Sequence, residues 1–90
     1  MHAVVVDVTL EAEPTPESLA VLQNEVVAGV KASPGCIAGY WLEPVDGKGH
    51  SIVLFDTEEQ ARAAAPPLGA APMPGVTIDR VDIRAVIATA

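Results

Sequence analysis

Two helix-start signals divide this chain of 90 residues and constrain its fold more than any other feature. Thr15 directly precedes Pro16, and Thr57 precedes Gln60 by three residues. A threonine at the start of a helix accepts a hydrogen bond from a free backbone N–H group. Proline is favoured at the first helical position, and glutamine three residues after the threonine completes a capping box. A run of β-branched residues ends shortly before each signal, so we expect a strand to lead into each helix.

The intervening segments complete the order of elements. Ser33-Pro34-Gly35 ends the first helix, Pro66-Pro67 ends the second, and an Asp-Gly pair lies at the centre of a turn. The expected strands cover residues 3–10, 36–43, 50–55 and 76–87, the helices residues 16–31 and 58–65, the turn residues 44–49 and a loop residues 66–75. This β-α-β-β-α-β order predicts one α+β domain over residues 1–90 with a ferredoxin-like fold. Its four-stranded antiparallel sheet has the order 4-1-3-2 and carries both helices on one face.

Two of the strands are apolar on consecutive positions, at Val4-Val5-Val6 and at residues 52–55. Successive side chains of a strand point to opposite faces, so both faces of the sheet carry apolar side chains. The helices cover only one face, and an exposed apolar patch usually marks an association surface. We therefore expect a homodimer that pairs through the sheet faces. With only 3% aromatic residues, a small core would gain stability from the second copy.

The net charge argues against several classes of partner, and the cysteine content indicates the compartment. A net charge of −7 repels polyanions, so we expect neither nucleic acid nor an anionic membrane surface as a partner. The segment MHAVVVDVTLEAE has no basic region or cleavage site of a signal peptide, and no apolar run is long enough to span a membrane. Cys36 is the only cysteine, which fits a reducing compartment. These features predict a cytoplasmic protein.

The hairpin after the first helix holds the only tyrosine and the only tryptophan. Tyr40 and Trp41 are adjacent on a strand and must therefore point to opposite faces. A hairpin loop over residues 44–49 predicts the cross-strand pairs Glu43–His50, Trp41–Ile52 and Tyr40–Val53. The aromatic side chain on the helix side could form the wall of a ligand pocket. Alternatively, both aromatic side chains simply fill the core and the interface.

Few other side chains suggest chemistry. His50 opposite Glu43 would be an acid/base pair or part of a solvated turn. Asp7 in the apolar first strand should meet Arg80 or Arg84 of the last strand, as an ion pair that sets the register or as a polar group in a cavity. Cys36 is expected to be a small buried hydrophobic residue. Histidine, cysteine and carboxylates lack the spacing of metal ligands, so we expect no metal and no cofactor.

One stretch of the chain resembles a known family. The sequence SPGCIAGYWLE (residues 33–43), a glycine turn and HSIVLFDTEEQARAA (residues 50–64) look like the dimeric α+β-barrel superfamily, and within it the antibiotic-biosynthesis-monooxygenase-like small proteins. The resemblance implies a homodimer whose sheets pack into a barrel, with one cavity per subunit between sheet and helices. Relatives in this superfamily include cofactor-independent oxygenases and members without known activity.

Two functions follow as hypotheses. The first is a cofactor-independent, monooxygenase-like enzyme acting on a small apolar or aromatic compound. The candidate pocket-lining residues are Trp41, Tyr40, Asp7 and His50. The alternative is a non-catalytic dimeric module that binds a ligand or a partner protein. It is motivated by the Asn, Trp and His set of the oxygenase members, of which only Trp41 lies at a matching place; the sole asparagine, Asn24, is on the first helix.

Overall fold

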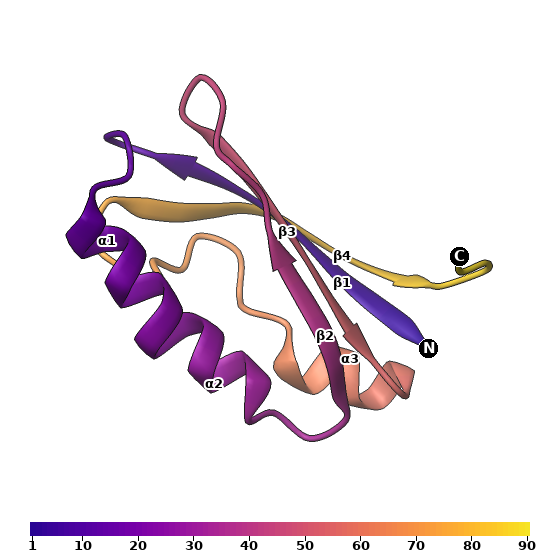
Figure 1. Ribbon diagram of the computed structural model, residues 1–90. Coiled ribbons are helices and arrows are strands. Elements are labelled where there is room, and N and C mark those ends of the chain that lie inside the picture. Colours follow the sequence, from indigo (N-terminus) through magenta and orange to yellow (C-terminus); the bar gives the residue numbers. More distant parts are fainter.

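The strand β1 (His2–Leu10) forms the centre of the sheet because it pairs on both sides. It is antiparallel to β3 (Lys48–Phe55) and to β4 (Val76–Ala85), while β2 (Cys36–Trp41) pairs with the outer edge of β3. The computed structural model describes residues 1–90 and has the strand order β2-β3-β1-β4 (Figure 1). The α+β class, the antiparallel sheet and the predicted order 4-1-3-2 are thus confirmed.

Two helices lie on one face of this sheet (Figure 1). The first runs without interruption through α1 (Pro16–Val21), the π-helical stretch η1 (Leu22–Val27) and α2 (Ala28–Lys31), and we call it the long helix. The second is α3 (Glu58–Ala64). Thr15 and Thr57 cap them through capping boxes, closed by Ser18 and by Gln60. Both predicted helix starts are confirmed, although the sequence pattern did not identify Ser18. No helix has both the length and the apolar character needed to cross a bilayer.

The hydrophobic core lies between the sheet and α3. Its fully packed members come from β1, β3, β4 and α3: Val4, Val6, Val53, Phe55, Ala61 and Ile78. The long helix has no buried residue in any of its three parts. The domain therefore holds together mainly through its strand pairing and through α3, and the long helix covers the sheet more loosely.

The hairpin between β2 and β3 is tighter than predicted. Asp46 and Gly47 have φ values of 53° and 74°, which make a two-residue turn closed by the bridge between Val45 and Lys48. β3 therefore starts at Lys48, before the predicted start, while β2 ends at Trp41, before the predicted end. The last strand also ends before the predicted residue, at Ala85.

The predicted register of this hairpin is wrong by one residue. Tyr40 lies opposite Ile52 and Trp41 opposite Ser51, and the backbone N–H of Leu42 donates to the carbonyl of His50. The expected Glu43–His50, Trp41–Ile52 and Tyr40–Val53 pairs are therefore not formed. The pairing slips between the Val45–Lys48 bridge and Leu42. Proline has no N–H group to donate, which accounts for a break in the ladder at Pro44.

A β-bulge in β4 changes the predicted ion pair of Asp7. Asp7 lies opposite Arg80, but Val8 lies opposite Ile78, so Asp79 is an extra residue in β4. Arg80 Nε lies 2.7 Å from Asp82 Oδ2, whereas the carboxylate of Asp7 contacts His50. The expected neighbourhood of Asp7 and Arg80 is confirmed, but the predicted ion pair with Arg80 or Arg84 is wrong. His50 on β3 is the closer partner because β1 lies between β3 and β4.

Candidate functional site

A long groove runs between the sheet and the long helix. Its volume is about 1470 Å³, and roughly half of its lining residues are hydrophobic. The sheet contributes Val4, Val6, Val8, Val53, Phe55 and Ile78; the long helix contributes Leu19, Leu22, Val26 and Val30. None of these helix side chains is fully buried, and of the four only Val30 packs against the core cluster on the sheet, which leaves the groove open.

The apolar stripe of the long helix faces this groove, and the π-helical stretch keeps it aligned with the helix axis. Leu22, Val26 and Val30 recur every four residues, and an α-helix of about 3.6 residues per turn would rotate such a series around its axis. A π-helical turn closes a wider ring, which rotates the series back. All three side chains therefore line the groove along one side of the helix.

Trp41 is the only aromatic residue besides Phe55 that lines the groove. Its ring lies across Gly39, the residue two positions earlier on the same face of β2. A β-carbon built on Gly39 would lie 2.9 Å from Cζ3 of Trp41 and 3.4 Å from Cγ2 of Val53. Real side chains do not approach so closely, so glycine at this position makes the room that the indole occupies.

Gly49 has a similar role at the hairpin end of the groove. It is buried, and a β-carbon there would lie 3.0 Å from Val8 and 3.3 Å from Leu10. Sequence reasoning did not identify Gly39 or Gly49 as site residues. The available signal was a glycine inside each strand, since glycine within a strand often marks close approach of another group.

The predicted pocket residues lie on two different faces. Trp41 lines the groove, whereas Tyr40 points away from it and is 59% exposed. The prediction that these two neighbours face opposite sides is confirmed. Asp7 lies between the groove-lining Val6 and Val8, so it faces away from the groove as well. His50 borders the groove at its end, but its Nδ1 lies 2.7 Å from Oδ1 of Asp7.

The sheet face that bears Tyr40 is not covered by any helix, and we call it the open face. Its apolar part consists of the exposed Tyr40 and Ile52, together with Val5 and Leu54. Its polar part holds the Asp7–His50 contact and the Arg80–Asp82 ion pair. Thr9 also lies there; it donates to Asp79 and accepts a 2.7 Å hydrogen bond from Lys48 Nζ. Apolar side chains on both faces of the sheet, as the sequence predicted, are thus confirmed.

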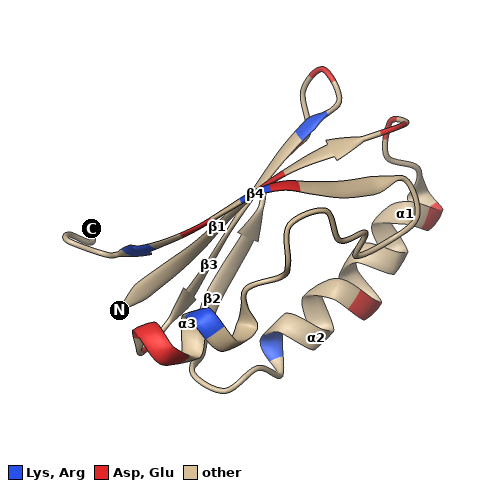
Figure 2. Ribbon diagram, turned by 180° about the vertical axis from the view of Figure 1, so that it is seen from behind, with Lys and Arg blue, Asp and Glu red and all other residues tan.

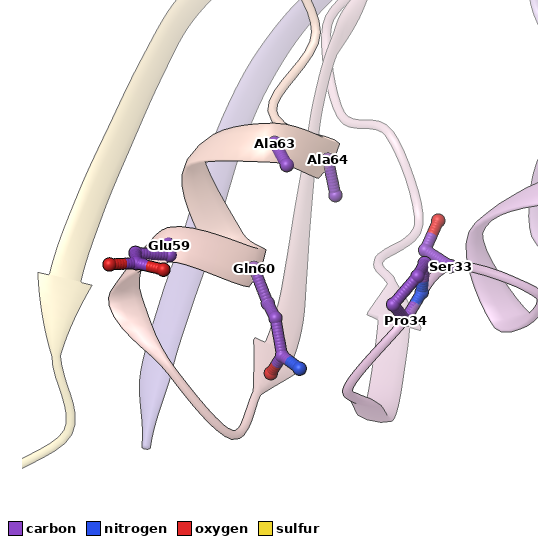
Figure 3. Close-up of a pocket in the computed structure, with 6 residues that line it drawn as sticks. All are labelled: Ser33, Pro34, Glu59, Gln60, Ala63 and Ala64. Atoms are coloured by element: carbon purple, nitrogen blue, oxygen red, sulfur yellow. The ribbon is translucent and has the colours of Figure 1, made fainter.

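A second, much smaller pocket of about 190 Å³ lies between α3 and the end of the long helix (Figure 3). Figure 3 shows Gln60 extending from α3 toward the segment that holds Ser33 and Pro34. The Gln60 amide already accepts from the Thr57 N–H group, and a β-carbon on Gly35 would collide with it at 1.9 Å. This pocket therefore marks the contact between α3 and the segment after the long helix, and the Gln60 amide oxygen in it is already engaged.

Neither the titratable groups nor the comparisons add a reactive centre to this picture. No group of three or more His, Cys, Asp or Glu residues is arranged to hold a metal ion, and Cys36 packs against the core as an unpaired thiol. On α3, the hydrogen bond from Arg62 holds the pKa of the Glu58 carboxyl below its ordinary value. No protein-family model matches this chain, and no curated protein matches it.

Proposed function

We propose that this protein binds a small apolar compound in the groove between the sheet and the long helix. The observation that carries this proposal is the size and lining of the groove, about 1470 Å³ with apolar side chains from all four strands and the long helix. Small-molecule sites typically measure about 300–1,000 Å³ and combine apolar walls with a few polar groups. The groove has room for a compound of that size, with Trp41 as a flat, polarisable wall.

Binding is better supported than catalysis because the deep part of the groove offers no acid or base. The core beneath it contains no buried polar or charged side chain. The polar side chains that line the groove are Trp41, Ser51, Thr15 and Ser18, with carboxylates and His50 nearer its end; the hydroxyls of Thr15 and Ser18 are engaged in the capping box of the long helix. Such groups orient a ligand without activating it.

Trp41 gives a direct test, because it is the only tryptophan in the chain. The measurement is the NMR signal of its indole N–H during titration with 1-naphthalenemethanol, an uncharged aromatic probe. We expect a saturable shift with a dissociation constant in the micromolar to millimolar range. The matched variant Leu22→Ser should weaken binding, whereas Ile52→Ser on the open face should not. A signal that stays unshifted at the solubility limit of the probe would contradict the proposal.

A second candidate is a cofactor-independent, monooxygenase-like activity on an aromatic compound. The observation in its favour is Trp41 in the groove wall, at the position that the family resemblance implies. The test is oxygen uptake in a sealed electrode with a panel of quinols and polycyclic phenols, using Trp41→Phe as the comparison. Oxygen uptake that exceeds the rate in buffer and that Trp41→Phe lowers would support the enzymatic activity. Binding of a compound without oxygen uptake would contradict this activity and support binding alone.

We also propose that two copies pair through the open face and form the dimeric α+β barrel. Tyr40 and Ile52 lie opposite each other on the neighbouring strands β2 and β3 and are 59% and 36% exposed, and an apolar sheet patch of this kind favours association. Light scattering should give twice the chain mass of 9.3 kDa. Ile52→Glu should give the mass of one chain, while Leu68→Glu, a control on an exposed loop residue, should leave the dimer intact. A monomeric wild-type protein at micromolar concentration would rule the pairing out.

The cytoplasmic location stays a proposal. It is supported by Cys36, which is the only cysteine and has no disulfide partner. Fractionation of the source cells with an antibody against the protein tests it, and recovery outside the cytoplasmic fraction would contradict it.

A further inference from the structure

The charged groups of the groove are of one sign and gather at one end. Glu11 and Glu13 come from the segment after β1, and Glu43 and Asp46 come from the connection between β2 and β3; all four line the groove. The two segments meet because the N–H of Leu10 donates to the carbonyl of Gly47 at 2.8 Å. Figure 2 shows acidic residues, in red, on both segments at the same end of the molecule. We call these four carboxylates the acidic rim.

No basic side chain neutralises the acidic rim. None of the four carboxylates takes part in an ion pair. The five basic residues of the chain lie elsewhere, and no lysine or arginine lines the groove. Lys48, which follows the turn directly, is engaged on the open face with Thr9 and, at 3.9 Å, with Asp79. The rim therefore adds an uncompensated negative potential to the end of an apolar groove.

We infer that the groove selects compounds with an apolar body and a cationic end, such as aromatic amines with an ammonium group. This inference rests on the proposed binding function and adds the class of ligand. The apolar body would lie along the valine, leucine and phenylalanine side chains, and the ammonium group would lie at the acidic rim. The indole face of Trp41, two residues before Glu43, attracts a cation as well. An anionic end in the same position would meet four like charges.

The rim carboxylates are exposed to water, which determines how the selection should depend on salt. Interactions of exposed charges are screened over about 8 Å at physiological ionic strength and over about 30 Å at 0.01 M. The preference for a cation should therefore be large at low salt and small at high salt. Apolar burial, in contrast, does not weaken with added sodium chloride, so a neutral compound reports the groove alone.

Three probes with one aromatic body separate these contributions: 1-naphthalenemethylamine, 1-naphthalenemethanol and 1-naphthoate. The measurement is the dissociation constant of each from the Trp41 indole N–H signal, at 0.01 M and at 0.5 M sodium chloride and at pH 7. At low salt we expect the amine to bind at least tenfold more tightly than the naphthoate, with the alcohol between them. At high salt the dissociation constants of the amine and the naphthoate should differ by no more than about threefold.

Matched variants test whether the rim is the cause. Glu11→Gln, Glu13→Gln, Glu43→Gln and Asp46→Asn combined in one protein should bring the three constants together and leave that of the alcohol unchanged. The control variant combines Glu17→Gln, Glu25→Gln, Asp56→Asn and Glu59→Gln, four acidic residues outside the groove. It changes the net charge by the same amount and should keep the preference for the amine. Circular dichroism confirms that both variants are folded.

The outcomes distinguish this inference from the function on which it rests. If the alcohol binds and the amine binds no better than the naphthoate at low salt, the inference is wrong and the binding function stands. If the control variant loses the preference as fully as the rim variant, overall charge is the cause and the inference is also wrong. If none of the three probes shifts the Trp41 signal, the binding function itself fails.

Discussion

The two helices lie on the same face of the sheet, but only α3 contributes a buried residue to the hydrophobic core. α3 is short, yet Ala61 is fully buried and packs with Phe55 and Val53 in the core. The long helix covers residues 16–31 and buries no side chain completely. Figure 1 shows the long helix standing away from the sheet, whereas α3 lies close to the ends of β1 and β3. Packing distance, more than helix length, therefore divides this molecule into a stabilising half around the core and a groove half beneath the long helix.

Side-chain size accounts for the difference. The inner surface of α3 consists of alanines, and small side chains let a helix approach a sheet closely. The long helix presents leucine and valine to a floor that already holds Phe55 and Trp41. Large side chains on both surfaces hold the two layers apart and leave the groove. Four predictions test this contrast between the halves, in order of expected effect.

The largest effect is expected from removing the side chain that anchors the stabilising half. Phe55 is 1% exposed, and Phe55→Ala should lower the free energy of unfolding by about 3–5 kcal/mol. Leu22→Ala on the long helix should cost about 1 kcal/mol or less, since its side chain is only half-buried beside an open groove. Urea denaturation of both variants measures this. Equal losses would show that the long helix packs as tightly as α3.

The contact between Gly35, which follows the long helix, and Gln60 of α3 provides the next test. Gly35 has a φ of 78° and leaves no space for a β-carbon beside Gln60, so Gly35→Ala should cost about 1–3 kcal/mol. In a Gln60→Ala background, the loss of stability caused by the clash with Gln60 should disappear, while the loss caused by the positive φ of residue 35 should remain. A double-mutant cycle by urea denaturation separates the two. An equal cost of Gly35→Ala in both backgrounds would remove the role assigned to Gln60.

Gly39→Ala tests the groove half, because a methyl group there would push against the Trp41 ring. We expect a loss of about 1 kcal/mol, at the low end for overpacking since the ring can move into the groove. The fluorescence maximum of Trp41 should shift and probe binding should weaken. Gly29→Ala is the matched control: nothing lies within 4 Å of its β-carbon, so it should be neutral or slightly stabilising. An unchanged Trp41 spectrum in Gly39→Ala would contradict the packing described here.

The smallest effect concerns the surface of α3. The hydrogen bond and the charge of Arg62 hold the pKa of Glu58 below its ordinary value of 4.5, and His2, 3.4 Å away, adds to this. A carboxyl with a lowered pKa stabilises the fold above the unfolded-state value and loses that contribution as the pH falls through the folded-state value. Wild-type protein should therefore lose slightly more stability than Glu58→Gln between pH 5 and pH 3. Parallel pH profiles of the two melting temperatures would disprove the contribution, which full exposure and salt keep small.

The order of elements could be predicted because local signals specify it. Thr15 and Thr57 cap helices whatever surrounds them, and Pro66 ends a helix for reasons internal to the backbone. The opposite directions of Tyr40 and Trp41 follow from the pleat of a strand, and the structure confirms them. The strand order of the sheet followed from the same sequence of elements.

The register and the partners of charged residues could not be predicted in the same way. One residue of slippage before the Asp46-Gly47 turn moved His50 away from Glu43. His50 instead contacts Asp7, because β3 pairs with β1 as well as with β2, and the hairpin pattern specifies only the β2 side. The bulge at Asp79 likewise left Arg80 beside Asp82. Each of these outcomes depends on a shift of one residue, which local propensity does not specify.

By itself, the sequence determined the helices, the strands, their order and a sheet with apolar side chains on both faces. These properties depend on backbone geometry and on periodicity, which act over a few residues. Only the tertiary structure decided that Trp41 faces a groove, that Gly39 makes room for it, and that four carboxylates from two separate segments share one rim. Those features depend on the distance between layers and on contacts between residues far apart in the chain, so they appear only when the whole chain is packed.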